Sequence, residues 1–484
     1  MTPSSTPGLR GGRQVRPYVV LAVCCMSLLM VSMDATIVNV ALPSVRRDLV
    51  VSTSGLQWVI DSYTLVVASV LMLAGSLADR FGRRRTFQTG MVVFTIASAL
   101  CSVAPGLNSL IAFRMLQAVG ASMLNPVAMS IITNTFIEPR ARARALGAWG
   151  AVVGISMALG PLVGGGLTEG IGWRSIFWIN VPIGIAAIVL AQRFVPESRA
   201  PRARRLDPVG QILVLAALAS LTYAVIEGPH HGWASPLIGG MFATAAVSVL
   251  ALVAYEPRQA EPLLDLRFFR SVPFASATVI AVCAFGAFAG FVFLNALYLQ
   301  EVRGMRAFQT GLYTLPLALA TIACSPISGR MVARWGTRPS LLIAGVSITT
   351  SAVLLSGLDP RTPLPQLVIA YVIFGIGFGM VNPPITNTAV SGMPRAQAGL
   401  AAAVASTSRQ VGASLGVAIA GTIASIGVAG RIAGFAEATH AYFWLVAGCG
   451  ALVVTLGALS STPWARASMR NIAALLDPEP SSAR

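Results

Sequence analysis

The sequence predicts an all-α polytopic membrane protein with fourteen transmembrane spans, and three observations lead to this prediction. Of its 484 residues, 55% are hydrophobic and only 11% are charged, and the mean hydropathy is +0.74, whereas a soluble globular protein carries about 25% charged residues. The apolar residues fall into stretches of about twenty, the length that crosses a hydrocarbon core of about 30 Å. The charged residues are mostly Arg and gather in alternate loops.

The apolar stretches give the order of the predicted helices and leave little of the chain for a soluble domain. They span 18–41, 56–77, 86–104, 108–131, 143–167, 175–193, 208–227, 234–254, 272–299, 309–330, 338–357, 365–388, 399–427 and 440–460. The longest polar stretches are rich in Pro, Ser or Arg, and we expect them to be loops or disordered. They are the N-terminal tail, 194–207, 255–271 and the C-terminal tail.

The Arg residues orient these helices. All 34 basic residues are Arg; the two tails and the loops on their side hold 25 of them, against 7 on the opposite side. An excess of basic residues in the loops marks the cytoplasmic side of a membrane protein, so both termini are expected to be cytoplasmic. The net charge of +17 therefore reflects topology and does not indicate nucleic-acid binding. The Arg-only, Ala- and Gly-rich composition is typical of a GC-rich bacterial genome, which predicts a multi-pass protein of the bacterial inner membrane.

The motifs of an enzyme or of an ATP-driven pump are not found. A chain without Lys cannot form a Walker-type phosphate loop. Residues Gly412 to Gly416 match G-x-S-x-G, but they lie in an apolar helix, whereas a nucleophile elbow needs a strand-to-helix turn. The six Cys fall in predicted spans without a C-x-x-C pair, so neither a metal site nor a disulfide is expected. We expect no enzymatic activity, no cofactor and no ATP, so that transport would draw on a gradient.

The chain contains an internal repeat. The segment GSLADRFGRRR (75–85) reappears as GRMVARWGTRP (329–339) at an offset of 254, and Gly120 with Asn125 and Pro126 matches Gly377 with Asn382 and Pro383 at an offset of 257. Two similar offsets indicate two related halves, with the seventh and eighth spans inserted between them. Two six-helix bundles around a binding cavity are a common design of secondary transporters.

Four segments resemble a known family. GSLADRFGRRR (75–85) looks like the signature loop of the major facilitator superfamily, and GISMALGPLVGG (154–165) resembles its antiporter motif. MDATIVNVALP (33–43) and WRSIFWINVPIG (173–184) are similar to the fourteen-span drug:proton antiporter branch of the EmrB and QacA type. The resemblance covers essentially the whole chain. It implies a transporter that exports drugs in exchange for protons.

The loop 75–85 is the first predicted functional element. Its acidic residue and its Arg run can make charge-assisted contacts to the ends of neighbouring helices and so hold one state of a rocking bundle. The alternative is a solvated cationic loop that only obeys the topology rule. The residues of this predicted conformational switch are Gly75, Asp79, Arg80, Gly82, Arg83 and Arg84.

The fifth span is the second predicted element. Its glycines expose the backbone for close helix packing, and its proline breaks one hydrogen bond and permits a bend. The resemblance makes it the direction-setting helix of an exporter, whereas generic packing of small residues is the alternative. The residues concerned are Gly154, Gly160, Pro161, Gly164 and Gly165.

Ionisable residues inside the spans are the third element, because each costs at least about 2.5 to 3.5 kcal/mol at a helix centre. From a rise of 1.5 Å per residue, Asp34 lies about 24 Å above the cytoplasmic end of its helix, and Asp61 and Arg114 lie roughly 8 to 9 Å below the outer end of theirs. Three charges at one level can form a cluster whose proton occupancy changes when the cluster becomes accessible or buried. Burial raises a carboxylate pKa, and a nearby Arg lowers it. In the family resembled, all three positions match, those of Asp34 and Arg114 being the energy-coupling ones. A static ion pair that fixes helix register is the alternative.

Three polar residues are candidates for a substrate cavity. Asn39 and Gln117 lie near the charged residues along their helices, where they can orient them or make ordinary interhelical hydrogen bonds. Arg409 lies about 16 Å from the cytoplasmic end of its span, where it can contact an anionic substrate group, form a switch with an acid or serve only in packing. Members of the resembled family that export divalent organic cations often carry an extra membrane acid in the second half, and this chain has no clear one there, so the resemblance disfavours export of such cations.

Together these features predict a proton-coupled exporter of a small apolar or amphipathic compound, such as an antibiotic, that acts as a monomer in the bilayer. The expected organisation is a cytoplasmic tail 1–17, a six-helix bundle 18–193, two inserted helices 208–254, a second bundle 272–460 and a cytoplasmic tail 461–484. An importer on the same scaffold is the first alternative, against which the antiporter motif argues. A non-transporting membrane sensor is the second, which the lack of a soluble domain disfavours.

Overall fold

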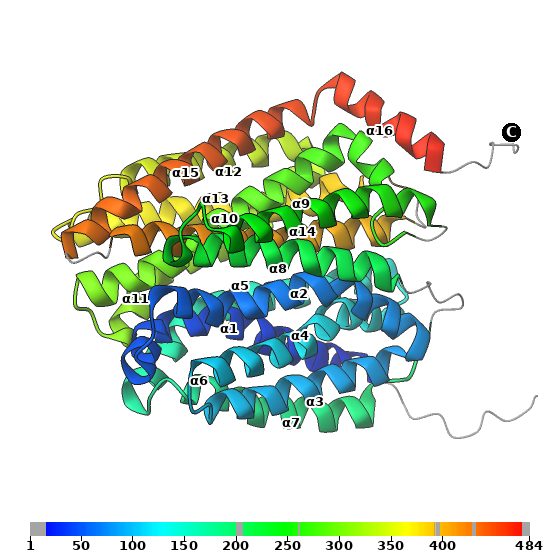
Figure 1. The fold of residues 1–484 in the computed structure, drawn as a ribbon. Coiled ribbons are helices and arrows are strands. Elements are labelled where there is room, and N and C mark those ends of the chain that lie inside the picture. The colour runs from blue at the N-terminus through cyan, green and yellow to red at the C-terminus, as the bar shows by residue number, and fades with distance from the viewer. Residues whose placement is uncertain are drawn as a thin grey trace, which may run out of the picture.

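The computed structural model describes residues 16–199, 207–259, 262–391, 393, 397–427 and 432–476, and these residues form helices without a strand. The helices run side by side, as Figure 1 shows. Before the predicted insert lie α1 (Pro17–Leu49), α2 (Thr53–Phe81), α3 (Arg83–Ser102), α4 (Leu107–Thr135), α5 (Pro139–Gly170), α6 (Ser175–Trp178) and α7 (Asn180–Phe194). The insert holds α8 (Pro208–His231) and α9 (Pro236–Tyr255), followed by the short helices η1 (Glu256–Arg258) and η2 (Leu266–Arg270). The second half holds α10 (Val272–Leu297), η3 (Tyr298–Val302), α11 (Ala307–Trp335), α12 (Thr337–Leu355), α13 (Leu364–Val390), α14 (Ala398–Gly427), α15 (Ile432–Leu459) and α16 (Pro463–Leu476).

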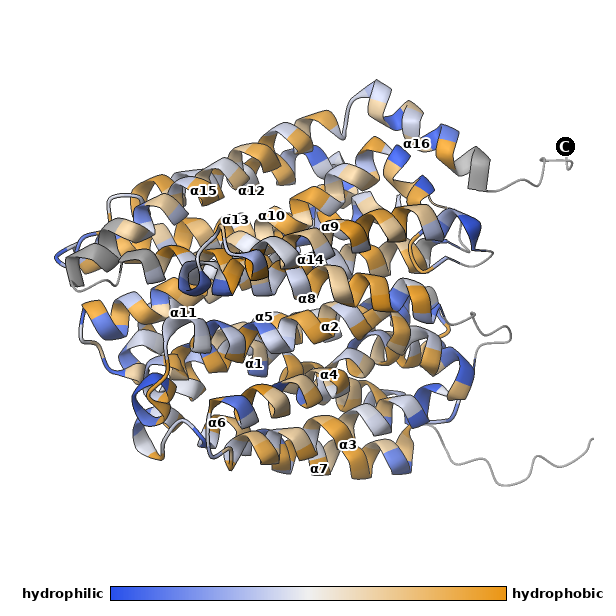
Figure 2. Ribbon diagram, viewed as in Figure 1, coloured by the Kyte–Doolittle hydropathy of each residue, from blue (hydrophilic) through white to orange (hydrophobic). Residues whose placement is uncertain are grey.

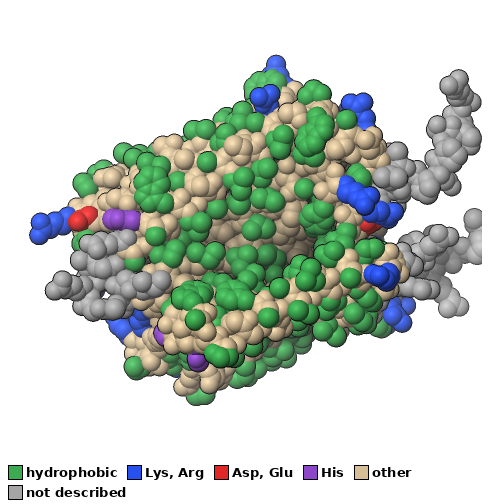
Figure 3. Space-filling model, turned by 45° about the horizontal axis from the view of Figure 1, so that its top comes forward, with side chains coloured by type: hydrophobic (Ala, Val, Ile, Leu, Met, Phe, Trp, Pro, Cys, Tyr) green, Lys and Arg blue, Asp and Glu red, His purple; other side chains and the backbone are tan. Residues whose placement is uncertain are grey.

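Every predicted span falls on a helix, with two local departures. The sixth span is broken into α6 and α7, and the ninth continues from α10 into the π-helical turn η3. Twelve helical segments of the described chain are long and apolar enough to cross a membrane; α3 and α14 are not among them. Hydrophilic residues gather toward the ends of the helices, with hydrophobic residues between them (Figure 2). The space-filling view has Arg side chains at the left and right ends of the molecule and others at its upper edge (Figure 3).

The C-terminal tail differs from its prediction, because it contains the helix α16 where we expected loop or disorder. The helix is amphipathic: Ala465 and Ile472 are buried, while Trp464, Arg466 and Arg470 are exposed. It packs on α10 and η2, and its Ser468 hydroxyl accepts a hydrogen bond from the backbone N–H of Val272 at 3.0 Å. Because Arg residues are interspersed with the apolar ones, the sequence pattern did not indicate an amphipathic helix at the end of the bundle. Residues 477–484 of that tail lie outside the described residues.

Helix packing follows the two halves of the sequence. Helices α1 to α7 pack mainly on one another, and so do α10 to α15. The main contacts between these groups are α5 with α11 and α2 with α14. Helix α8 of the insert packs on both α2 and α14, and α9 packs mainly on α8. The insert therefore lies beside one of the two seams between the halves.

Matching positions of the repeat have matching geometry. Gly82 ends α2 with φ +110°, and Gly336 ends α11 with φ +80°. Just before each glycine an Arg guanidinium lies over the next aromatic ring, Arg80 over Phe81 at 5.7 Å and Arg334 over Trp335 at 5.5 Å. Backbone angles in this range are open to glycine and strained for other residues. The sequence repeat is thus repeated in the backbone.

Candidate functional site

The structure pairs Asp34 of α1 with Arg114 of α4. The Asp34 Oδ2 atom and the Arg114 Nη1 atom lie 2.5 Å apart, and the two side chains are 0% and 2% exposed. A buried charge is tolerated only where it is paired and hydrogen-bonded. The pair joins two helices that the sequence predicted to carry charges at similar depth.

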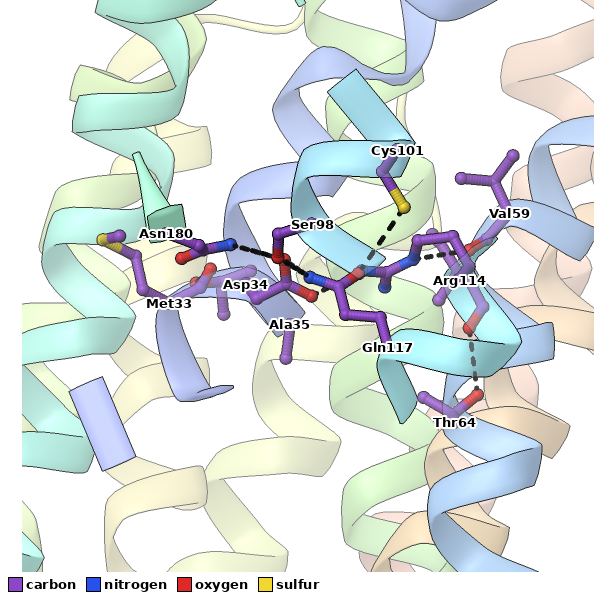
Figure 4. Close-up of polar contacts among 12 residues, drawn as sticks. Met33, Asp34, Ala35, Val59, Thr64, Ser98, Cys101, Arg114, Gln117 and Asn180 are labelled. Carbon is purple, nitrogen blue, oxygen red and sulfur yellow. Dashed lines mark hydrogen bonds and ion pairs between the residues drawn. The ribbon is translucent and has the colours of Figure 1, made fainter. Parts of the chain in front are cut away.

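Polar side chains from two further helices surround this carboxylate (Figure 4). Gln117 donates to Asp34 Oδ1 at 2.9 Å and accepts from Arg114 at 2.7 Å, so it bridges both charges. Asn180, the first residue of α7, donates to the same Asp34 oxygen at 3.2 Å. The Ser98 hydroxyl of α3 accepts from Gln117 at 2.6 Å. Arg114, Gln117 and Asn180 each donate a hydrogen to the carboxylate, and Ser98 acts one step away as an acceptor for Gln117.

Arg114 has a second set of partners on α2. Its Nε atom donates to the Val59 carbonyl at 3.3 Å, and its guanidinium lies 4.2 Å from the centre of the Tyr63 ring. A cation over an aromatic face is stabilised by the ring quadrupole, most strongly where water is excluded. Arg114 is therefore held between the carboxylate and α2, a helix that contacts the second half.

Asp61 lies apart from this pair, although we expected three charges in one cluster. It is buried on α2, its Oδ1 atom accepts from the Thr64 hydroxyl at 3.4 Å, and its carboxyl group lies beside the Ser414 hydroxyl of α14. One turn earlier, Gln57 donates to the Ala418 carbonyl of α14 at 2.7 Å. Residues four apart share a helix face, so Asp61 faces the α2–α14 seam. Depth along a helix could be estimated from the sequence, whereas rotation about its axis could not.

The predicted switch loop is held by an acidic residue that the sequence analysis did not select. Glu197, just after α7, accepts from the Arg84 backbone N–H at 3.1 Å, and its Oε2 atom lies 3.8 Å from Arg85 Nε. Asp79 pairs with Arg83 at 3.1 Å. These contacts connect the loop with the end of α7 in the same half. Glu197 is an acidic residue in an Arg-rich segment, and this exception to the basic pattern could have identified it as a partner of the loop.

Gly82 provides a direct test of this loop. We expect Gly82→Ala to destabilise the protein by about 1–3 kcal/mol, because alanine is strained at φ +110° and its Cβ would overlap the Glu197 carboxylate. The measurement is the thermal unfolding midpoint of the purified protein in detergent. The matched control is Gly75→Ala, where a Cβ has no neighbour within 4 Å. Equal midpoints for the two variants would contradict the prediction.

The small residues of α5 lie against two helices. A Cβ on Gly160 or Gly164 would collide with Thr36 or Ile37 of α1. Gly165 lies against the backbone of Ala307 and Phe308 in α11. In α11, Gly311 lies against the Pro161 carbonyl, and the Ile322 side chain lies against Gly154. The predicted antiporter helix thus packs on its own half and on the other half through its small residues.

The ion pairs between the halves lie at one end of the molecule. Arg46 pairs with Glu301 at 2.6 Å, and Glu169 pairs with Arg306 at 3.0 Å. In the described chain these are the ion pairs that join the two groups of helices, and on the predicted topology they lie at the outer end. Gln300 adds a hydrogen bond to the Val40 carbonyl at 2.8 Å.

The three candidates for a substrate cavity separate in the structure. Asn39 lines a small pocket between α1, α5, α10 and α11. Gln117 is enclosed in the Asp34 network. Arg409 donates to the Thr386 hydroxyl and lies 5.6 Å from the centre of the Phe285 ring. No ion pair to Arg409 is found in the described part of the chain.

Fold and site together define a polytopic membrane transporter built of helices. The chain belongs to the Major Facilitator Superfamily, whose family model matches residues 24–417. It is 37% identical to the "Multidrug resistance protein Stp" of Mycobacterium tuberculosis over 82% of this chain and 74% of that protein. It is 34% identical to the "Tetracenomycin C resistance and export protein" of Streptomyces glaucescens over 87% of this chain and 77% of that one. The solved structure of the human organic anion transporter MFSD10 shares the fold, with a TM-score of 0.63, 16% identity and coverage of 92% of this chain and 100% of that chain.

Proposed function

We propose that this protein is a proton-coupled efflux transporter that exports a small apolar or amphipathic compound, such as an antibiotic, in exchange for external protons. Relatives named for multidrug resistance and for resistance and export of tetracenomycin C support the efflux part. The observation that carries the coupling part is the buried Asp34–Arg114 pair, in which Arg114, Gln117 and Asn180 all donate to the carboxylate.

The proposed coupling step is protonation of Asp34. A protonated carboxyl carries an O–H hydrogen that needs an acceptor, whereas Arg114, Gln117 and Asn180 all donate to this site, so protonation removes the match between the carboxylate and its donors. Removing one charge of a buried pair leaves the other uncompensated, at about 3–5 kcal/mol. A difference of that size between two conformations is enough to shift their populations strongly. Arg114 also contacts α2, which provides a route from the proton to the α2–α14 seam.

The other predicted elements have supporting roles in this proposal. Asp61 faces the seam and is a second proton-binding group. The loop of Gly82 holds one state through its contacts to the end of α7, and α5 sets the direction of transport through its contact with α11. The outer ion pairs Arg46–Glu301 and Glu169–Arg306 support a state that is closed to the outside and reached by substrate from the cytoplasm.

We further propose fourteen spans with both termini cytoplasmic in the bacterial inner membrane. Helices α3 and α14 would complete two six-helix bundles, 18–193 and 272–460, because their 20 and 30 residues pack alongside the apolar helices. The segment 208–254 would be the inserted pair, and 1–17 and 461–484 the cytoplasmic tails. One chain contains both halves, which is consistent with a monomer.

Inverted membrane vesicles test the function. Respiration acidifies their interior, and a fluorescent pH dye inside reports proton loss. We expect tetracenomycin C or another compound of an antibiotic panel to release protons from vesicles that contain the protein and not from empty vesicles. Accumulation of the same compound that persists after a protonophore collapses the gradient would contradict proton coupling.

A further inference from the structure

The pocket between the halves contains two buried amide groups, each with one atom that lacks a hydrogen-bond partner in the described part of the chain. It is lined by Asn39 of α1 and Asn295 of α10, together with Phe288, Phe291 and apolar or Thr side chains of α1, α5, α10 and α11. Asn39 Oδ1 and Asn295 Nδ2 are buried without a partner among the described residues. A buried polar atom without a partner costs about 1–3 kcal/mol, so such atoms in a pocket indicate a ligand that completes them.

In each amide one atom makes a hydrogen bond within the protein, and this bond determines which atom is left without a partner. Asn39 Nδ2 donates to the Ala35 carbonyl of its own helix at 3.2 Å, which leaves Oδ1 as a free acceptor. Asn295 Oδ1 accepts from the Tyr371 hydroxyl, which leaves Nδ2 as a free donor. The pocket therefore offers one acceptor from the first half and one donor from the second.

The rest of the lining excludes a charged ligand and favours a flat one. No charged side chain lines the pocket in the described part of the chain. The hydroxyl hydrogens of Thr36, Thr310 and Thr314 are engaged by carbonyls of their own helices. Phe288 stacks on Phe378 at 4.2 Å, and Phe291 stacks on Phe374 at 4.7 Å, so the aromatic wall is held in place and can stack on an aryl group.

We propose that this pocket selects neutral aryl compounds with a hydrogen-bond donor for Asn39 and an acceptor for Asn295, so that the bound compound joins the two halves. This inference names the substrate class of the proposed exporter and rests on that function. Apolar pockets with few polar groups gain their specificity from such groups, because a ligand that lacks the matching atom leaves them unpaired.

Three probes of similar shape separate the two hydrogen bonds. Benzanilide carries an N–H donor and a carbonyl acceptor, phenyl benzoate carries the carbonyl without the N–H donor, and trans-stilbene carries neither. We expect affinity for the purified protein to fall about tenfold at each step, which is about 1.4 kcal/mol. Competition against radiolabelled benzanilide in detergent, without a proton gradient, measures the affinity of each probe. Tetraphenylphosphonium is expected not to compete.

Variants assign each step to one residue. Asn39→Leu is expected to remove the difference between benzanilide and phenyl benzoate. Asn295→Leu combined with Tyr371→Phe is expected to remove the difference between phenyl benzoate and stilbene, and the double change avoids a Tyr371 hydroxyl without a partner. The matched control is Asn134→Leu, because Asn134 makes the same bond to its own helix, to the Ser130 carbonyl, at an exposed position.

Three results would overturn the inference: equal affinities for the three probes, no binding of benzanilide, or steps that persist in the variants. The binding assay needs neither Asp34 nor a gradient. Graded binding with no proton release in vesicles would therefore refute the coupling and leave the pocket assignment standing. Proton release without graded binding would refute the pocket assignment and leave the proposed coupling standing.

Discussion

Asp34→Asn is expected to abolish proton release by substrate while leaving exchange of substrate across the membrane intact. Asparagine has the shape of the protonated acid and cannot give up a proton, so the cycle would lose its coupling step. Dye-loaded inverted vesicles measure proton release, and counterflow of a radiolabelled substrate without a gradient measures exchange. The expected loss of coupling is complete, whereas exchange of substrate should remain measurable.

A matched acid on the same helix separates this effect from a general loss of charge. Asp48 pairs with Arg174 at 2.5 Å, but its side chain is 47% exposed. Exposed ion pairs contribute at most about 1 kcal/mol, so Asp48→Asn is expected to keep proton release. Undiminished proton release by Asp34→Asn would refute the proposed role of Asp34.

The ion pair also makes a prediction about folding. Arg114→Gln alone leaves Asp34 buried without its counter-charge and is expected to lower stability by about 3–5 kcal/mol. Combining it with Asp34→Asn removes both charges and should restore most of the loss. Unfolding midpoints in detergent of the wild type, the two single variants and the double variant measure this interaction. Additive losses would contradict a direct pair.

The sequence predicted the helices well because length and hydropathy decide whether a segment can cross a membrane. Its internal repeat also matched Gly82 with Gly336, and both have positive φ angles in the structure. The short break between α6 and α7 and the helix α16 were missed, because both depend on packing against neighbours. Asn180 lies in the family-like segment 173–184 and was not among the predicted site residues, yet it donates a hydrogen bond to Asp34.

The site was predictable in its charges and not in its partners. Asp34 and Arg114 were selected because an unpaired charge in lipid is costly, and they form the buried pair. Asp61 satisfied the same criterion and lies apart, since rotation about the axis of α2 turns it to the α2–α14 seam. Asn295 has no sequence signal beyond being polar in an apolar span, and its importance comes from the pocket that it lines.

Gly165→Val is expected to stop transport by preventing closure of the outer end. At Gly165 the helices α5 and α11 approach so closely that a Cβ would overlap the Ala307 carbonyl and the Phe308 backbone. Backbone atoms cannot move aside as a flexible side chain can, so valine would separate the helices and weaken the nearby Glu169–Arg306 pair. The protein would then favour the state that is open outward, and export should fall at least about tenfold.

The neighbouring glycine provides the control, because a Cβ on Gly166 would lie 3.8 Å from the Phe308 ring, an ordinary contact distance. We expect Gly166→Val to retain export. A cysteine at an outer seam position, labelled by a membrane-impermeant maleimide, reports opening: Ala307→Cys should label faster with Gly165→Val than with Gly166→Val. Lost export with unchanged labelling would mean that valine acts on folding or on substrate binding, and the seam would not be the gate. We also expect the stability coupling between Asp34 and Arg114 to stay unchanged in Gly165→Val while the labelling becomes faster. The outer gate and the proton site would then be two distinct parts of one rocking structure.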